Sequence, residues 1–166
     1  MRLWCDEDGY FYNRNTDTGE FNKRTSPTNF YPLLAGVATP KQAEAMISRH
    51  LLNPEEFWGE YVITSTPRND PAYHNNDYWR GRIWAPLNFL VYMGLKKSAD
   101  PQLCREFAGK SRNLFLQSWL KDGYVFENYN PDSGQGDDVN RSDKFYHWGA
   151  LLAYISLIEN NLISID

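Results

Sequence analysis

Four of the dipeptides in which a small polar residue precedes proline limit how this chain can fold. The polar side chain of each is suited to cap the first turn of a helix, and the proline is suited to the first helical position. Because proline breaks the interior of helices and paired strands, each dipeptide predicts the beginning of a helical turn. The four are Ser26-Pro27, Thr39-Pro40, Asn53-Pro54 and Asp100-Pro101, and Gln42 completes a capping box with Thr39.

Apolar residues at helical spacing follow these signals, so the chain is predicted to be mainly α-helical. The expected helices run from Ser26 to Gly36, Thr39 to His50, Tyr78 to Leu95, Asp100 to Asp122 and Trp148 to Ile158, with a short turn from Asn53 to Trp58. In the longest helix, the side chains expected in the core are Leu103, Cys104, Phe107, Leu114, Phe115 and Trp119.

Short extended pieces are expected between the helices. Residues 10–12 and 20–21 flank a polar turn, which predicts a small hairpin. Alternation over residues 124–129 predicts a strand on which Glu127 shares a face with Val125 and Tyr129. A carboxylate among aromatic side chains tends to have a perturbed pKa, which marks Glu127 as a candidate acid or base. The alternative is an edge glutamate that faces water.

Composition excludes several classes of function. The net charge of −4 gives little attraction for nucleic acid, and no apolar run reaches the roughly 20 residues that a membrane span needs. We therefore expect neither a nucleic-acid partner nor a membrane. Only two cysteines, and no signal-peptide pattern in residues 1–8, slightly favour the cytoplasm. That preference holds only if no segment precedes Met1.

Aromatic residues make up 16% of the chain, which fits either a core of large side chains or a sugar site built from flat rings. Two tryptophans and two arginines cluster in Tyr78–Trp84, at the expected start of a helix. The segment is either a site for a hydroxyl-rich ligand or a helix start anchored by core aromatics. In the first case tryptophan supplies stacking and arginine supplies hydrogen bonds.

The connections at residues 60–77 and 128–141 are long, and long ordered loops commonly carry function. The second is rich in asparagine and aspartate and superficially fits calcium. It fails the EF-hand pattern because Gly134 comes one position late and Val139 replaces the terminal acid. A calcium site of another kind stays open. The three histidines are scattered, so we expect no other metal site and no cofactor.

Six segments spread over nearly the whole chain carry a family resemblance. They are Trp4 with Asp8–Tyr12, Phe30–Gly36, Pro67–Tyr73, Tyr78–Trp84, Phe126–Tyr129 and Phe145–Leu151. In this order they resemble the C-terminal part of the catalytic domain of glycoside hydrolase family 63, the processing α-glucosidases. They are also similar to the related mannosylglycerate hydrolases and trehalases.

The resemblance implies an (α/α)6 toroid with a sugar pocket at one end, and glycoside hydrolysis with inversion. One carboxylic acid protonates the leaving oxygen while a second, ionised carboxylate activates water from the opposite face. By resemblance, Glu127 holds the position of this general base. The residues that match sugar-binding positions are Tyr78, Trp79, Arg80, Trp84, Asp70, His147 and Trp148.

Two departures from the family pattern shape the prediction. Arg82 stands where the family commonly has proline, and the segment with the family's general acid would precede Trp4. Fewer helices are expected than a complete toroid contains. We therefore expect residues 1–166 to be the C-terminal portion of such a domain, an all-α partial (α/α)6 toroid of helical hairpins with long loops and short β pieces.

The expected function is a part of an inverting hydrolase of an α-linked glucoside or mannoside. It should be inactive alone, and its partners should be the carbohydrate substrate and either the missing N-terminal part or another chain. One alternative is a non-catalytic carbohydrate-binding or interaction module derived from such an enzyme. A purely structural role is a further alternative.

Overall fold

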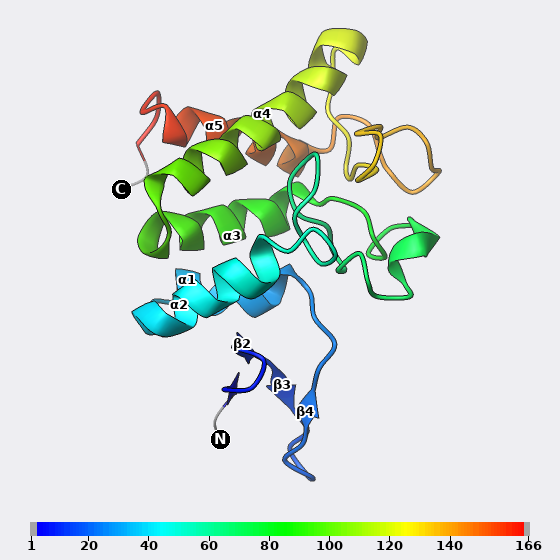
Figure 1. Cartoon of the computed structure of the whole chain (residues 1–166). Helices are drawn as coiled ribbons and strands as arrows, with labels where there is room; N and C mark the ends of the chain where they lie inside the picture. Colours follow the sequence, from blue (N-terminus) through cyan, green and yellow to red (C-terminus); the bar gives the residue numbers. More distant parts are fainter. Residues whose placement is uncertain (1–2, 165–166) are drawn as a thin grey trace.

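The structure is a computed structural model that describes residues 3–164, and helices predominate in it (Figure 1). The α-helices are α1 (Tyr31–Leu34), α2 (Pro40–Met46), α3 (Ala85–Ser98), α4 (Pro101–Asp122) and α5 (Leu151–Glu159). Shorter helical turns are η1 (Pro27–Phe30), η2 (Ile47–Leu51), η3 (Tyr73–Asn75) and η4 (His147–Ala150). Within residues 3–164, none of the helices combines the length and the apolar character that crossing a membrane requires.

The helix starts predicted at the polar–proline pairs are confirmed. The backbone amide of Gln42 donates to Thr39 Oγ1 at 3.4 Å, and the Thr39 amide donates to Gln42 Oε1 at 2.9 Å. Asp100 accepts the Gln102 amide at 3.0 Å at the start of α4. Asn53 begins a short turn, as expected, in which its carbonyl accepts the backbone amides of residues 56–58.

The helix expected from Tyr78 begins only at Ala85, so that prediction is wrong for its first two turns. Tyr78 and Gly81 have φ angles of +51° and +92°, which an α-helix does not accommodate. Pro86 lies in the first turn of α3, where its missing amide and its ring set an upstream limit to the helix. The aromatic segment is therefore a loop that leads into α3.

The hairpin expected between residues 10–12 and 20–21 is wrong in its pairing. β1 (Trp4–Cys5) pairs antiparallel with β2 (Tyr10–Phe11), and β3 (Asn13–Arg14) pairs antiparallel with β4 (Phe21–Asn22). Gly9, at φ +69°, closes the first turn by donating its amide to the Cys5 carbonyl at 2.9 Å. Because of this tight turn, Tyr10 pairs with Cys5 upstream and not with residues 20–21 downstream.

The core lies around α3, with α1 and α2 on one side and α4 and α5 on the other (Figure 1). Phe107 of α4 is fully buried, as expected, and packs near Tyr92 of α3, with 6.2 Å between ring centroids. Trp119, which the spacing places in the core, is instead 48% exposed. The reason is that the last turns of α4 extend beyond the shorter α5 (Figure 1), and Trp119 there stacks on Phe115 of the same helix.

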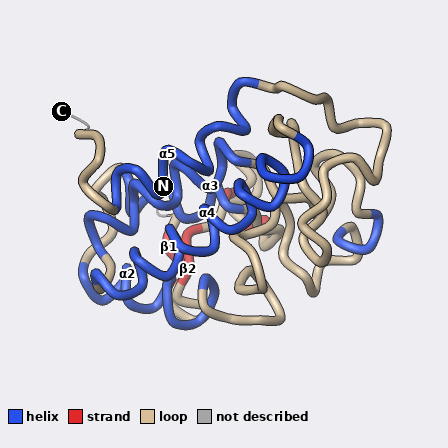
Figure 2. The backbone as a smooth tube through the Cα atoms, turned by 90° about the horizontal axis from the view of Figure 1, so that it is seen from above, coloured by secondary structure: helices blue, strands red, loops and turns tan. Residues whose placement is uncertain are grey.

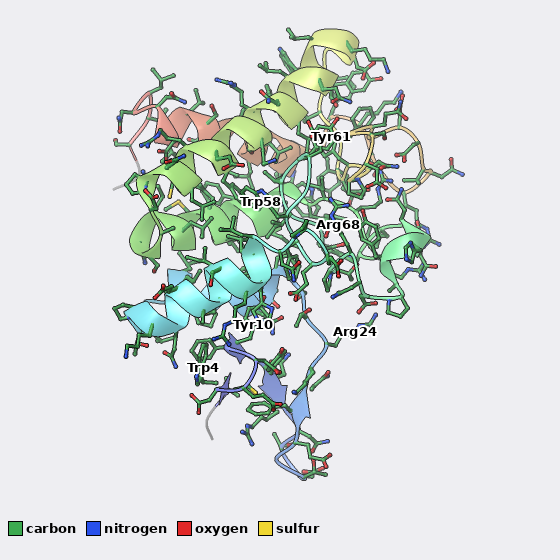
Figure 3. All side chains as sticks on the ribbon, in the orientation of Figure 1. Trp4, Tyr10, Arg24, Trp58, Tyr61 and Arg68 are labelled. Atoms are coloured by element: carbon green, nitrogen blue, oxygen red, sulfur yellow. The ribbon has the colours of Figure 1, made fainter. Side chains whose placement is uncertain are left out.

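The long loops gather at one end of the helices. Seen from above, the helical part lies to one side and most of the loop to the other (Figure 2). Tyr61 and Arg68 reach from the loop after α2 toward the loop after α4 (Figure 3). Tyr61 Oη donates to the Ser133 carbonyl at 3.2 Å, and Arg68 Nη1 lies 3.3 Å from Asp132 Oδ1. The two loops that hold the sequence-predicted site residues are thereby joined.

The packing of α4 predicts a contrast between two substitutions on that helix. Phe107→Ala should lower the free energy of unfolding by about 3–5 kcal/mol, because it leaves a cavity beneath α3. Leu120→Ala on the same helix should change it by less than about 0.5 kcal/mol, because Leu120 is 78% exposed. Urea unfolding of both variants checks this, and equal losses would contradict the assigned core.

Candidate functional site

A pair of backbone hydrogen bonds brings the site together. The Ile83 amide donates to the Tyr129 carbonyl at 2.8 Å, and the Tyr129 amide donates to the Ile83 carbonyl at 3.0 Å. A second isolated bridge joins Phe126 to Lys144. The loop before α3 therefore lies against the segment that carries Glu127.

Four of the sequence-predicted aromatic residues form one cluster. Trp79 stacks on Trp84 with ring centroids 3.6 Å apart and planes within 13° of parallel. Tyr78 meets Trp84 edge-on at 5.0 Å, and Trp148 approaches Trp84 at 5.9 Å. Trp84 is fully buried, whereas Trp79 is 43% exposed. Trp84 thus supports Trp79 from beneath, and Trp79 is the indole that offers a free surface.

Glu127 lies at the edge of this cluster. Trp148 Nε1 donates to the Glu127 carbonyl at 3.2 Å, and the Glu127 amide donates to the Asp143 carbonyl at 2.8 Å. Burial and the nearby charge of Asp143 raise the pKa of the Glu127 carboxyl, against a hydrogen bond from the Asp143 backbone amide. A carboxyl with a raised pKa is suited to proton transfer near neutral pH.

The strand alternation predicted around Glu127 is wrong. Residues 125–129 are all buried, and they form only isolated bridges to Ile83 and Lys144. The segment is covered on both sides because α4, η4 and the loop before α3 all converge on it. Glu127 therefore shares no exposed face with its neighbours, and it is not an edge glutamate facing water.

Arg80 shares a cleft with Trp79. The cleft has a volume of about 480 Å³, and Arg24 also lines it. The Arg80 guanidinium is paired with Asp77, at 2.8 Å between Nη2 and Oδ2. Asp70 contacts the cleft only indirectly, through Arg24, whose Nε lies 3.4 Å from Asp70 Oδ2. This cleft is the opening onto which the exposed side of the aromatic cluster faces.

His147 and Trp148 occupy the first positions of η4. The exposed His147 ring stacks on Tyr146, with 5.4 Å between centroids, and lies 5.7 Å from Trp148. The structure therefore groups Tyr78, Trp79, Trp84, Trp148, His147 and Glu127 through direct contacts, while Arg80 and Asp70 lie at the neighbouring cleft.

Sequence reasoning missed several residues of the cleft. Ser65 and Thr66 line it, and their hydroxyl groups are buried without a hydrogen-bond partner. Arg24 comes from the turn after β4, far upstream of the other lining residues. No local motif points to these positions. The one available signal is that Ser65 and Thr66 directly precede the family-like segment Pro67–Tyr73.

Carboxylates of the Asn/Asp-rich loop contact other protein groups. Arg82 Nη2 lies 2.7 Å from Asp138 Oδ1, and Tyr73 Oη donates to Asp132 Oδ1 at 3.0 Å. Among the described residues, one group with the spacing of metal ligands lies elsewhere, at Cys5, Glu7 and Asp8. There the Lys23 ammonium lies 2.9 Å from Asp8, so a cation already accompanies that group.

Comparison with known proteins places these features among glycoside hydrolases. Residues 1–148 match the family model described as the mannosylglycerate hydrolase MGH1-like glycoside hydrolase domain. A mannosylglycerate hydrolase of Thermus thermophilus is 29% identical over 154 residues, covering 91% of this chain and 34% of that protein. A probable trehalase of Eremothecium gossypii is 31% identical over 149 residues, covering 87% of this chain and 20% of that protein.

Solved structures agree with the sequence matches. The crystal structure of a GH63 mannosylglycerate hydrolase from Thermus thermophilus, in complex with Tris, has a TM-score of 0.74 and 25% identity. The match covers 92% of this chain and 34% of that one. The chain therefore spans only about a third of this neighbour and a still smaller part of the trehalase relative.

The left-handed backbone at Gly81 predicts a local effect on the aromatic cluster. In Gly81→Ala the new Cβ atom would collide with the Tyr73 carbonyl oxygen, and alanine rarely adopts the φ of +92° found at this position. The loop must therefore shift, at a cost of about 1–3 kcal/mol. Near-ultraviolet circular dichroism should then lose part of the signal of the Trp79–Trp84 stack. Gly109→Ala is the control, because it meets no atom within 4 Å and should stabilise α4 by up to about 1 kcal/mol.

Proposed function

The chain belongs to the mannosylglycerate hydrolase MGH1-like family of glycoside hydrolases, and from this premise we propose that it forms part of the active site of an inverting α-glycosidase. The observation that carries the proposal is the buried Glu127, whose backbone carbonyl accepts from Trp148 of an aromatic cluster with one exposed indole. In this proposal the helices are one portion of an (α/α)6 toroid, whose remaining helices come from another part of the protein.

We propose that Glu127 acts as the general base. In an inverting reaction its carboxylate takes a proton from water while that water attacks the anomeric carbon. Its raised pKa makes the carboxylate a stronger base for the proton that it must accept from water. The general acid is proposed to lie in the upstream part of the domain, about 6.5–9.5 Å from Glu127 across the bound sugar.

The proposed substrate is an α-linked glucoside or mannoside. Trp79 has an exposed face for stacking on a pyranose ring, and Arg80 lies beside it with hydrogen-bond donors. Tyr78, Asp70 and His147 are proposed to line the rest of the sugar site. Trp84 and Trp148 contribute by holding Trp79 and the Glu127 backbone in place.

A second candidate is a carbohydrate-binding module without catalysis. The observation in its favour is that Trp79, Arg80 and the cleft lie within this one chain. Such a module should bind sugar as the isolated chain, and its longer protein should show no hydrolysis that depends on Glu127. The two candidates therefore differ in the effect of one substitution.

Glu127→Gln tests the catalytic role in the longest protein that contains this chain. The substitution should lower kcat at least about 10²-fold while leaving KM largely unchanged, because the amide keeps the shape and cannot accept the proton. In the unsubstituted protein kcat/KM should rise with pH through the Glu127 pKa, above the ordinary value of 4.5, as the carboxyl ionises. Near-normal turnover in the variant would reject the base assignment.

Sugar titration of the isolated chain tests the binding surface. The chain alone should release no sugar from α-glucosides, yet a bound sugar should change its tryptophan fluorescence. Trp79→Ala should weaken this binding about tenfold, the value of one aromatic stacking contact. Trp119→Ala removes a similarly exposed indole from the end of α4 and should leave the affinity unchanged. Equal effects of the two variants would rule out Trp79 as the stacking residue.

A further inference from the structure

Arg82 is a fully buried arginine whose guanidinium has a protein partner at each nitrogen. Its Nη2 and Nη1 atoms lie 2.7 and 3.2 Å from the two oxygens of Asp138, so the pair is bidentate. Nη2 also donates to the Gln135 carbonyl at 3.3 Å, and Nη1 donates to Asn76 Oδ1 at 3.4 Å. Nε donates to Asn128 Oδ1. The side chain thus links the loop before α3 to the whole loop after α4.

Such a group needs an explanation because burying a charge is costly. A buried ion pair adds little net stability, but breaking it is strongly destabilising, and in some proteins it selects one conformation. Burial raises the pKa of Asp138, but hydrogen bonds from Arg82 and Asn130 outweigh it, so the pKa is lowered and the carboxylate is held charged.

The contacts of Arg82 lead to Asn128, the residue after Glu127, and to the segment that pairs with the Glu127 backbone. Asn128, which accepts from Arg82, donates through Nδ2 to the Arg141 carbonyl at 2.8 Å. Ser142 Oγ donates to the Asn128 carbonyl at 2.7 Å. The next residue, Asp143, supplies the backbone groups that bind Glu127. One side chain therefore braces the residue after Glu127 and, through it, the loop that covers Glu127.

We propose that the Arg82–Asp138 ion pair is a positioning device that holds Glu127 in its buried position. Arg82 acts through Asn128 and the loop of residues 135–143, and it does not itself contact the reacting atoms. The statement that this positioning serves catalysis rests on the proposed function. The statement that the ion pair positions Glu127 does not. The two statements can therefore be tested separately.

Asp138→Asn is the primary test, because it keeps the shape and one acceptor oxygen but removes the charge. Carboxyl-carbon NMR of the full chain should show the Glu127 pKa falling toward its ordinary value, as the loop loosens and water reaches the carboxylate. Hydrogen exchange of the Glu127 amide, which donates to Asp143, should accelerate at least about tenfold. Exchange of the Val91 amide in α3 should stay within about twofold.

Two further variants complete the design. Lys96→Met removes another ion pair, which joins α3 to α5 at 3.1 Å, and should alter neither Glu127 reading. Arg82→Lys keeps the charge but loses the fork that binds Asp138 and Asn128, and should give an intermediate shift. It also serves as the test if Asp138→Asn does not fold by circular dichroism.

Several outcomes would overturn the proposal. One is an unchanged Glu127 pKa and exchange rate in a folded variant that lacks the ion pair. Another is equal acceleration at Glu127 and Val91, which would mean that the pair acts only on global stability. Failure of the proposed function has a different signature: Glu127→Gln would then leave turnover intact while Asp138→Asn still shifted the Glu127 pKa.

Discussion

The antiparallel hydrogen bonds between Ile83 and Tyr129 are the contact on which the arrangement of the loops depends. They join the segment before α3 to the segment after α4, and the packing of those two helices places the two segments at the same end of the fold. Closing so long a loop costs conformational entropy, and the packing of α3 against α4 reduces the length of flexible chain that has to be closed. Together with the contacts of Tyr61, Arg68 and Arg82, the pairing of the two segments brings the aromatic residues of one loop near the Glu127 segment of the other.

The helical part of the fold could be predicted from the sequence because its signals are local. Thr39 with Gln42, and Asp100 with Pro101, define helix starts by chemistry within one turn. The prediction failed at Tyr78, where apolar spacing continued past a proline and two left-handed residues. It also failed for Trp119, because spacing shows which face of a helix is apolar but not how far a neighbouring helix covers it.

The candidate site was predictable only in part, for a related reason. Glu127, Trp79 and Trp84 lie in family-like motifs that can be recognised one at a time, and the structure brings them together. The role of Arg24 and the pairing of Arg82 with Asp138 involve partners distant in the sequence. No spacing rule relates such residues, since their proximity is a property of the folded loops.

The stacking of Trp79 on Trp84 has a consequence for how a ligand can be recognised. An aromatic ring has two faces, and Trp79 uses one of them on Trp84 at 3.6 Å. The two rings therefore present one free aromatic face, so a flat ligand that stacks on Trp79 is contacted by this pair on one side only. In the proposed sugar site, discrimination between sugars that differ on the side of the ring away from Trp79 must come from other groups, which the indole pair does not supply.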